Sequence, residues 1–387
     1  MTWPAPRLLA GLAGALLALG VPVAPAHADA VRDAQWQLTY LDMARVHQTS
    51  QGEGITVAVI DAGINGNHPD LTGNVLQGVS LVPGHPGNGW DDTEQHGTAM
   101  AGFIAAHGHN GGGALGIAPK AKILPIQLPP ASIQLPPTKS SDLGILARGI
   151  DAAVQRGARV ISISQSAPGG GIELENAVRA AQDHDVVVVA AAGNLPQDAG
   201  GVTWPARYDG VVAVAAIDRN GNHPAFSVTG PQVLVSAPGA ETESTSKGNG
   251  YQLANGTSDA TAITAGVVAL IRSRYPKMSA VDVIHRLTAT AIDKGPKGRD
   301  PEYGYGVVNP YAALTADIPS IDPTASATPP ASGAASPSPS QSPAATRHTN
   351  PTGIAVIVVF VAVAVLASTG IRRAATRYRR SKGREDQ

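Results

Sequence analysis

The chain has 387 residues, 43% of them hydrophobic, and its formal net charge at pH 7 is -1. This length suits one large domain with further segments, and the near-neutral charge gives no reason to expect nucleic-acid binding. The sequence contains no cysteine, which excludes disulfide bonds and thiolate metal sites.

The N-terminal residues 1–30 have the pattern of an export signal. They contain Arg7, then a short apolar run, then small-x-small sequences ending at Ala28 and Ala30. A charged start, an apolar stretch and a small-residue cleavage site together predict a secretory signal peptide. The apolar run is short for a membrane span, so we favour cleavage over an uncleaved anchor.

The C-terminal part of the chain has the pattern of a membrane anchor. Residues 352–371 carry no charge and are rich in valine, isoleucine and alanine, while residues 372–387 are rich in arginine. This predicts one transmembrane helix with a cytoplasmic basic tail. Residues 317–351 are rich in proline and serine and predict an extended stalk. The body, residues 31–316, is therefore expected outside the cell membrane.

Within the body, strand and helix patterns alternate after a short amphipathic lead-in at residues 31–47. Apolar runs predict buried strands at 54–63, 117–126, 160–164, 186–194, 211–216 and 233–237. Helical patterns cover residues 96–106, 143–156 and 174–183, and a turn at 255–256 opens a buried helix that runs to 272. This alternation predicts a three-layer α/β sandwich with a mainly parallel central sheet. The repeated Ile-Gln-Leu-Pro-Pro at 126–130 and 133–137 predicts a surface loop.

Four polar residues stand where these elements meet turns. Asp61 and Asn194 end buried strands, and functional residues in parallel sheets lie at the carboxyl ends of strands. His96 and Ser258 each begin a helix of small residues. A turn-capping aspartate and a serine N-cap are the simpler interpretations of Asp61 and Ser258. Acyl transfer by serine, however, needs a base, an acid that orients it and an oxyanion donor, and these four groups supply all of them.

The order aspartate, histidine, serine is that of subtilisin. The chain resembles the subtilisin-like serine proteases in the segments Val59–Gly63, His96–Thr98, Ala191–Asn194 and Asn255–Ser258. The ordered set of four motifs is far more specific than any one of them. The resemblance implies a subtilisin-like fold and hydrolysis of peptide bonds, without a metal or cofactor.

A narrower resemblance is to the mycosins, the membrane-anchored subtilases of actinobacterial type VII secretion. It is carried by Trp36–Leu38, by Ser50–Gly54, by the missing long pro-domain, and by the stalk and anchor. The resemblance implies a protein or peptide substrate and a type VII secretion membrane complex as partners. It also implies a single-pass protein of the cell membrane, with its protease domain on the extracellular side.

The family resemblance assigns a role to each residue of the site. Ser258 is the nucleophile, His96 transfers the proton, and Asp61 orients His96. The Asn194 side chain and the Ser258 backbone N–H are the oxyanion donors. The residues implied in binding an extended substrate are Ser164, Gln165, Ser166 and Gly193. The acidic segment 91–94 could hold calcium, but we favour a solvated loop.

Three residues depart from the family pattern. Ala62 replaces a hydroxyl residue after the aspartate, Asp259 replaces methionine after the nucleophile, and Ala262 replaces a proline of the following helix. We expect Asp259 either to oppose charge on the oxyanion or to contact a basic substrate side chain or a partner subunit. These departures keep a second function open, that of a non-catalytic structural subunit of a secretion complex that uses a subtilase fold.

Overall fold

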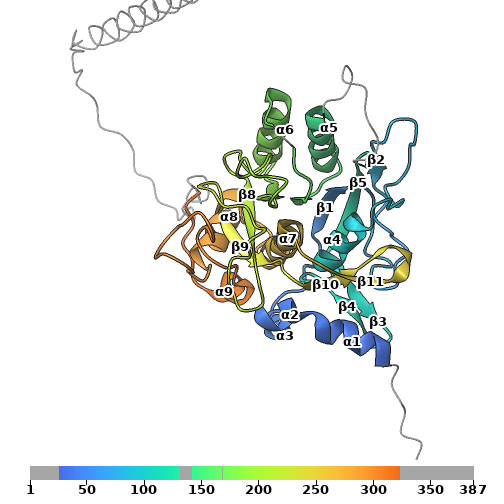
Figure 1. Ribbon diagram of the computed structural model, residues 1–387, viewed down its shortest axis with the longest axis horizontal. Helices are drawn as coiled ribbons and strands as arrows, with labels where there is room; N and C mark the ends of the chain where they lie inside the picture. The colour runs from blue at the N-terminus through green and yellow to red at the C-terminus, as the bar shows by residue number, and fades with distance from the viewer. Residues whose placement is uncertain (1–25, 131–141, 168, 323–387) are drawn as a thin grey trace, which may run out of the picture. The chain divides into compact units, whose positions relative to one another are not determined.

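The computed structural model describes residues 26–130, 142–167 and 169–322 (Figure 1). Its centre is a seven-stranded sheet in the order β2-β5-β1-β6-β7-β8-β9, in which every neighbouring pair is parallel. The predicted α/β architecture with a mainly parallel sheet is therefore confirmed. The strands of this sheet are β1 (Thr56–Asp61), β2 (Val79–Ser80), β5 (Lys122–Gln127), β6 (Val160–Ile163), β7 (Val187–Ala191), β8 (Val212–Ile217) and β9 (Val235–Pro238).

Helices and two small hairpins surround the sheet. The α-helices of the described residues are α1 (Ala26–Ala34), α2 (Trp36–Tyr40), α3 (Met43–Val46), α4 (His96–Ala105), α5 (Asp142–Gln155), α6 (Ile172–Asp183), α7 (Thr257–Arg274), α8 (Ala280–Ala289) and α9 (Pro310–Thr315). The antiparallel hairpins are β3 (His107–His109) with β4 (Gly112–Leu115), and β10 (Thr242–Thr245) with β11 (Tyr251–Ala254). A short 3-10 turn, η1 (Lys247–Asn249), lies between β10 and β11.

The sheet is covered on both faces because successive side chains of a strand point to opposite sides. On β1, Val57 and Val59 belong to the core that contains α4 and α7. Ala58 and Ile60 belong to the second core, which contains α5 and α6. Figure 1 shows α5 and α6 together on one side of the sheet, with the hairpins and α1–α3 on the other. Burial on both faces explains why the strands are almost continuously apolar.

The strand predicted over 117–126 begins five residues too early and ends one residue too early. The backbone N–H groups of Ile117 and Ala118 donate to the carbonyls of Phe103 and Ile104, so they complete the last turn of α4 instead of entering the sheet. The strand β5 begins only at Lys122 and ends at Gln127. The surface-loop prediction is therefore wrong for residues 126–127, and residues 131–141 lie outside the described residues.

The N-terminal lead-in packs on the domain, as predicted. Met43 and Val46 of α3 are buried in the same hydrophobic core as α7. The Trp36 indole donates to the carbonyls of Ala240 and Glu241 at 3.2 and 2.9 Å. Within the described residues, α1 begins at Ala26 and so crosses the predicted cleavage sites. Residues 1–25 lie outside the described residues.

The C-terminal segment stays attached to the domain as far as the structure describes it. Asp282 of α8 accepts hydrogen bonds from the Ser320 hydroxyl at 2.6 Å and from the Ile321 backbone N–H at 2.8 Å. No helix among residues 26–130, 142–167 and 169–322 is long and apolar enough to cross a membrane. The predicted span at 352–371 and the tail at 372–387 lie outside the described residues.

Candidate active site

Ser258 is the second residue of α7, a helix that is buried along almost its whole length. Every residue of α7 from Thr257 to Arg272 is buried, and Ser258 itself is 8% exposed. The small residues Ala260, Ala262, Ala265, Gly266 and Ala269 let the helix pack closely on several sides. The first turn of a helix such as α7 has N–H groups without partners inside the helix, and it lies at the positive end of the helix dipole. Negative charge that develops at Ser258 is therefore favoured.

Asp61 and His96, which are 35 residues apart, meet at the carboxyl end of β1. Asp61 is 1% exposed, and its Oδ2 lies 2.8 Å from Nδ1 of His96. The close approach of α4 depends on the glycine after His96, because a Cβ on Gly97 would lie 2.0 Å from the Gly63 carbonyl oxygen. The two side chains predicted to act together are thus joined directly.

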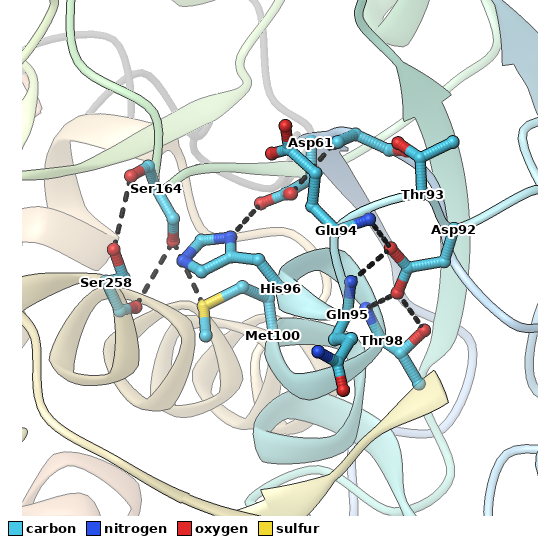
Figure 2. A network of polar contacts seen from close by, with 11 residues as sticks. Asp61, Asp92, Thr93, Glu94, Gln95, His96, Thr98, Met100, Ser164 and Ser258 are labelled. Atoms are coloured by element: carbon cyan, nitrogen blue, oxygen red, sulfur yellow. Dashed lines mark hydrogen bonds and ion pairs between the residues drawn. The ribbon is translucent and has the colours of Figure 1, made fainter. Parts of the chain in front are cut away.

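Ser258 lies beside this pair but is hydrogen-bonded elsewhere. Its Oγ donates to the Ser164 carbonyl at 3.2 Å, and the Ser164 Oγ donates to the Ser258 carbonyl at 3.2 Å. In the described part of the chain no hydrogen bond joins Ser258 to His96. Figure 2 shows the His96 ring between Asp61 and this pair of serines. Nε2 of His96 is therefore directed towards the two serines.

Asn194 follows β7, and its side-chain amide is oriented by α7. Oδ1 accepts hydrogen bonds from the Thr257 backbone N–H at 3.0 Å and from the Thr257 hydroxyl at 3.3 Å. Among the described residues Nδ2 has no acceptor. Because the carbonyl end of the amide is held by α7, the N–H₂ end is available as a donor next to Ser258. Thr257, which orients it, was not singled out from the sequence.

The predicted substrate-binding residues follow two neighbouring strands. Segment 164–166 continues from β6, and Gly193 follows β7, which pairs with β6 through Ile163 and Ala190. Parallel strands that are neighbours end at the same edge of the sheet, so these residues lie beside Asn194. The segment leaves the edge at Ala167, whose N–H donates to Trp204. Ser164 and Gln165 are half-buried and Ser166 is exposed.

Residues 52–306 match the profile of the subtilase family, peptidase S8. The chain belongs to the subtilase family. It is 38% identical over 275 residues to the thermostable alkaline protease of Halalkalibacterium halodurans, a match that covers 71% of this chain and 72% of the relative. This subtilase is accordingly a serine endopeptidase.

Solved structures of mycosins are similar to this subtilase. MycP1 from the ESX-1 type VII secretion system aligns with a TM-score of 0.66 and 31% identity, covering 73% of this chain and 86% of MycP1. The MycP3 protease from the type VII (ESX-3) secretion system aligns with a TM-score of 0.63 and 32% identity, covering 73% of this chain and 88% of MycP3. The resemblance to mycosins found in the sequence is thus confirmed.

The departure of this subtilase at Ala62 leaves Asp61 hydrogen-bonded. The backbone N–H of Ala62 donates to Oδ1 of Asp61 at 2.8 Å. Oδ2 is taken by His96, so both carboxylate oxygens have a partner. A hydroxyl at position 62 is therefore not required to hold this carboxylate.

The departure at Asp259 places a second carboxyl near His96. Asp259 is 2% exposed, and its Oδ2 accepts a 2.6 Å hydrogen bond from the Thr242 hydroxyl of β10. Burial raises the pKa of Asp259 to about 7, against the lowering effects of the Thr242 hydrogen bond and the charge of His96. A residue buried in this way cannot reach a substrate side chain or a partner subunit, so that expectation is wrong.

The charges around His96 favour its protonated form. Burial lowers the pKa of His96, but the charge of Asp61 and its hydrogen bond, followed by the charges of Asp259 and Asp92, raise it to about 9. At neutral pH the imidazole is therefore mainly protonated, and it becomes a free base only in alkaline solution.

Asp92, in the acidic segment 91–94, holds the helix that begins with His96. Oδ1 of Asp92 accepts the backbone N–H groups of Glu94 and Gln95, and Oδ2 accepts both the N–H and the hydroxyl of Thr98 (Figure 2). Asp92 thus caps the N-terminus of α4, and the solvated-loop interpretation is wrong for this residue. In the described part of the chain no group of acidic and histidine side chains has an arrangement that could hold a metal ion.

Proposed function

We propose that this subtilase is a membrane-anchored extracellular endopeptidase in which Asp61, His96 and Ser258 form the catalytic triad. The observation that carries the proposal is the 2.8 Å bond between Asp61 and His96, with Ser258 beside it at the start of α7. A carboxylate on Nδ1 fixes the tautomer in which Nε2 can accept a proton.

In the proposed reaction Ser258 Oγ attacks the scissile carbonyl carbon while Nε2 of neutral His96 takes the hydroxyl proton. Asp61 stabilises the imidazolium that results. His96 then gives the proton to the leaving amine, and water hydrolyses the acyl-enzyme by the same route in reverse. Before attack, Ser258 must leave the Ser164 carbonyl, to which it donates at 3.2 Å.

The oxyanion of the tetrahedral intermediate would be held by Nδ2 of Asn194 and by the backbone N–H of Ser258. The free amide end of Asn194 and its contact with Thr257 support this role. Loss of one such donor costs roughly 100- to 1000-fold in kcat. The substrate backbone would lie along Ser164, Gln165 and Ser166, with Gly193 on the other side, as an added strand.

For the whole chain we propose a signal peptide at 1–30, a protease domain at 31–316, a stalk at 317–351, a transmembrane helix at 352–371 and a cytoplasmic tail at 372–387. The apolar and arginine-rich patterns of the sequence support this topology. MycP1 and MycP3 come from type VII secretion systems, and we extend that link to this chain.

A structural subunit of a secretion complex is the second candidate function. The contact of the Ser258 hydroxyl with Ser164, and a pKa of about 9 for His96, favour it, because both oppose attack at neutral pH. Labelling with a fluorophosphonate at pH 9.5, where about three quarters of His96 is neutral, separates the two. The protease requires that the unmutated protein is labelled and that folded Ser258→Ala is not. A folded, unmutated protein that stays unlabelled would favour the structural subunit.

A further inference from the structure

Asp198 is a carboxylate bound to the backbone of Asn194. Its Oδ2 accepts a 2.7 Å hydrogen bond from the Asn194 backbone N–H. In return the Asp198 backbone N–H donates to the Asn194 carbonyl at 2.9 Å, which closes a tight turn around Leu195–Pro196. Hydrogen bonds from an N–H to a carboxylate are among the stronger ones in proteins.

The carboxylate also lies directly against the preceding glycine. Gly193 has a φ of 116°, and a Cβ there would lie 2.9 Å from Oδ2 of Asp198. Only glycine fits this position, and its absent side chain is what lets Asp198 reach the Asn194 N–H. A side chain at position 193 would therefore both strain the backbone and push the Asp198 carboxylate away from the Asn194 N–H.

The other polar groups around Asn194 are already fixed. Leu195 N–H donates to Phe226 at 2.7 Å, and Val228 N–H donates to Gly193 at 3.1 Å, so the chain is held on both sides. Thr257 holds Oδ1 of Asn194. In the described part of the chain Nδ2 alone has no partner. Every polar atom of Asn194 thus has a hydrogen-bond partner except Nδ2, the one that would face the oxyanion.

We propose that Asp198 is a positioning residue, which fixes the backbone of Asn194 so that Nδ2 points to the oxyanion of the tetrahedral intermediate. The inference rests on the proposed oxyanion role of Asn194. Oxyanion donors act only when they are held in place before the reaction, and a displacement of about 1 Å can cost roughly 100-fold. Without Asp198 the backbone N–H of Asn194 loses its acceptor, and the turn at 194–198 can shift.

The test compares kcat and KM of the full-length protein on one peptide for Asp198→Ala, Asp198→Asn, Asn194→Ala and the double variant Asp198→Ala with Asn194→Ala. Asp209→Ala, at an exposed residue, is the matched control. We expect Asp198→Ala to lower kcat about tenfold or more, with KM changed less than twofold. Asp198→Asn keeps an acceptor oxygen and should recover most of the loss.

The double variant identifies the route of the effect. If Asp198 acts through the Asn194 amide, removing it in the Asn194→Ala background lowers kcat less than twofold further. Losses that multiply in the double variant, or a rise in KM with kcat unchanged, would overturn the inference while leaving the triad intact. An Asn194→Ala protein that keeps its full kcat would instead refute the oxyanion role and the inference with it. Thermal unfolding of each variant separates loss of positioning from loss of fold.

Discussion

Replacing Asp259 tests how this site sets the pKa of its base. The Asp259 carboxyl is buried next to Ser258 and bound to Thr242, and its charge is one of those that raise the pKa of His96 to about 9 against the effect of burial. Asp259→Met removes that charge. Because a negative neighbour favours the imidazolium, its removal lowers the pKa of His96, and the rise of kcat with pH moves to lower pH.

The size of the effect follows from the fraction of neutral His96. At pH 8, a histidine with a pKa of about 9 is neutral in about one molecule in ten. If the charge of Asp259 contributes about 1.4 kcal/mol to holding the proton on His96, its removal lowers the pKa of His96 by one unit. A shift of that size would leave about half of His96 neutral at pH 8, a gain of about fivefold in kcat. At pH 10.5 the imidazole is neutral in both proteins, so the gain disappears.

The assay is steady-state hydrolysis of one peptide at pH 8 and pH 10.5 by the unmutated protein and by Asp259→Met. Asp209→Asn removes an exposed carboxylate and serves as the control. Thr242→Val should act in the same direction, because loss of its hydrogen bond raises the pKa of Asp259 and leaves it more often neutral. An equal gain at both pH values would mean that Asp259 repels the oxyanion directly, and no gain at pH 8 would refute the coupling.

Three further predictions test the topology, the substrate and the cap of α4. Protease added to intact cells should cut within residues 317–351 and release the body; an externally recovered tail would reverse the orientation. Ser258→Ala in the producing cell should leave an exported protein at its uncleaved length, seen by mass spectrometry of the medium, and identical secreted proteins would favour a structural role. Asp92→Ala should lower the free energy of unfolding in denaturant by about 1 kcal/mol, and it should lower kcat because α4 positions His96. An unchanged kcat would mean that the cap does not position His96 for catalysis.

The fold could be predicted because its strands are buried on both faces. Runs such as 57–60 and 187–191 are apolar without interruption, and the helices between them are amphipathic or rich in small residues. Such alternation leaves few architectures. Asp61 and Asn194, which follow these runs, could be singled out because functional residues in parallel sheets lie at the carboxyl ends of strands. The structure joins Asp61, which ends one of these runs, to His96 at the start of α4 by a direct hydrogen bond.

The supporting contacts could not be predicted because they join segments that are close only in the folded chain. Thr242 lies 17 residues before Asp259 on a hairpin that the sequence pattern did not reveal. Asp92 is one of several acidic residues in its loop, and only its bonds to Thr98 and to the N–H groups of the loop distinguish it. The sequence does predict the helix start at His96, but a carboxylate four residues before a helix is only a weak signal for a cap.

The departures from the family motif at Ala62 and Asp259 differ in consequence, because one removes a hydrogen-bond donor and the other adds a charge. At position 62 the lost hydroxyl is a hydrogen-bond donor, and the Ala62 backbone N–H donates to the same Asp61 carboxylate. At position 259 the new side chain adds a charge, and no backbone group can remove a charge from a buried site. The Thr242 hydroxyl satisfies the carboxyl but leaves its effect on His96 in place. We therefore expect Ala62→Thr to change kcat little, and replacement of Asp259 to shift the pH dependence of kcat.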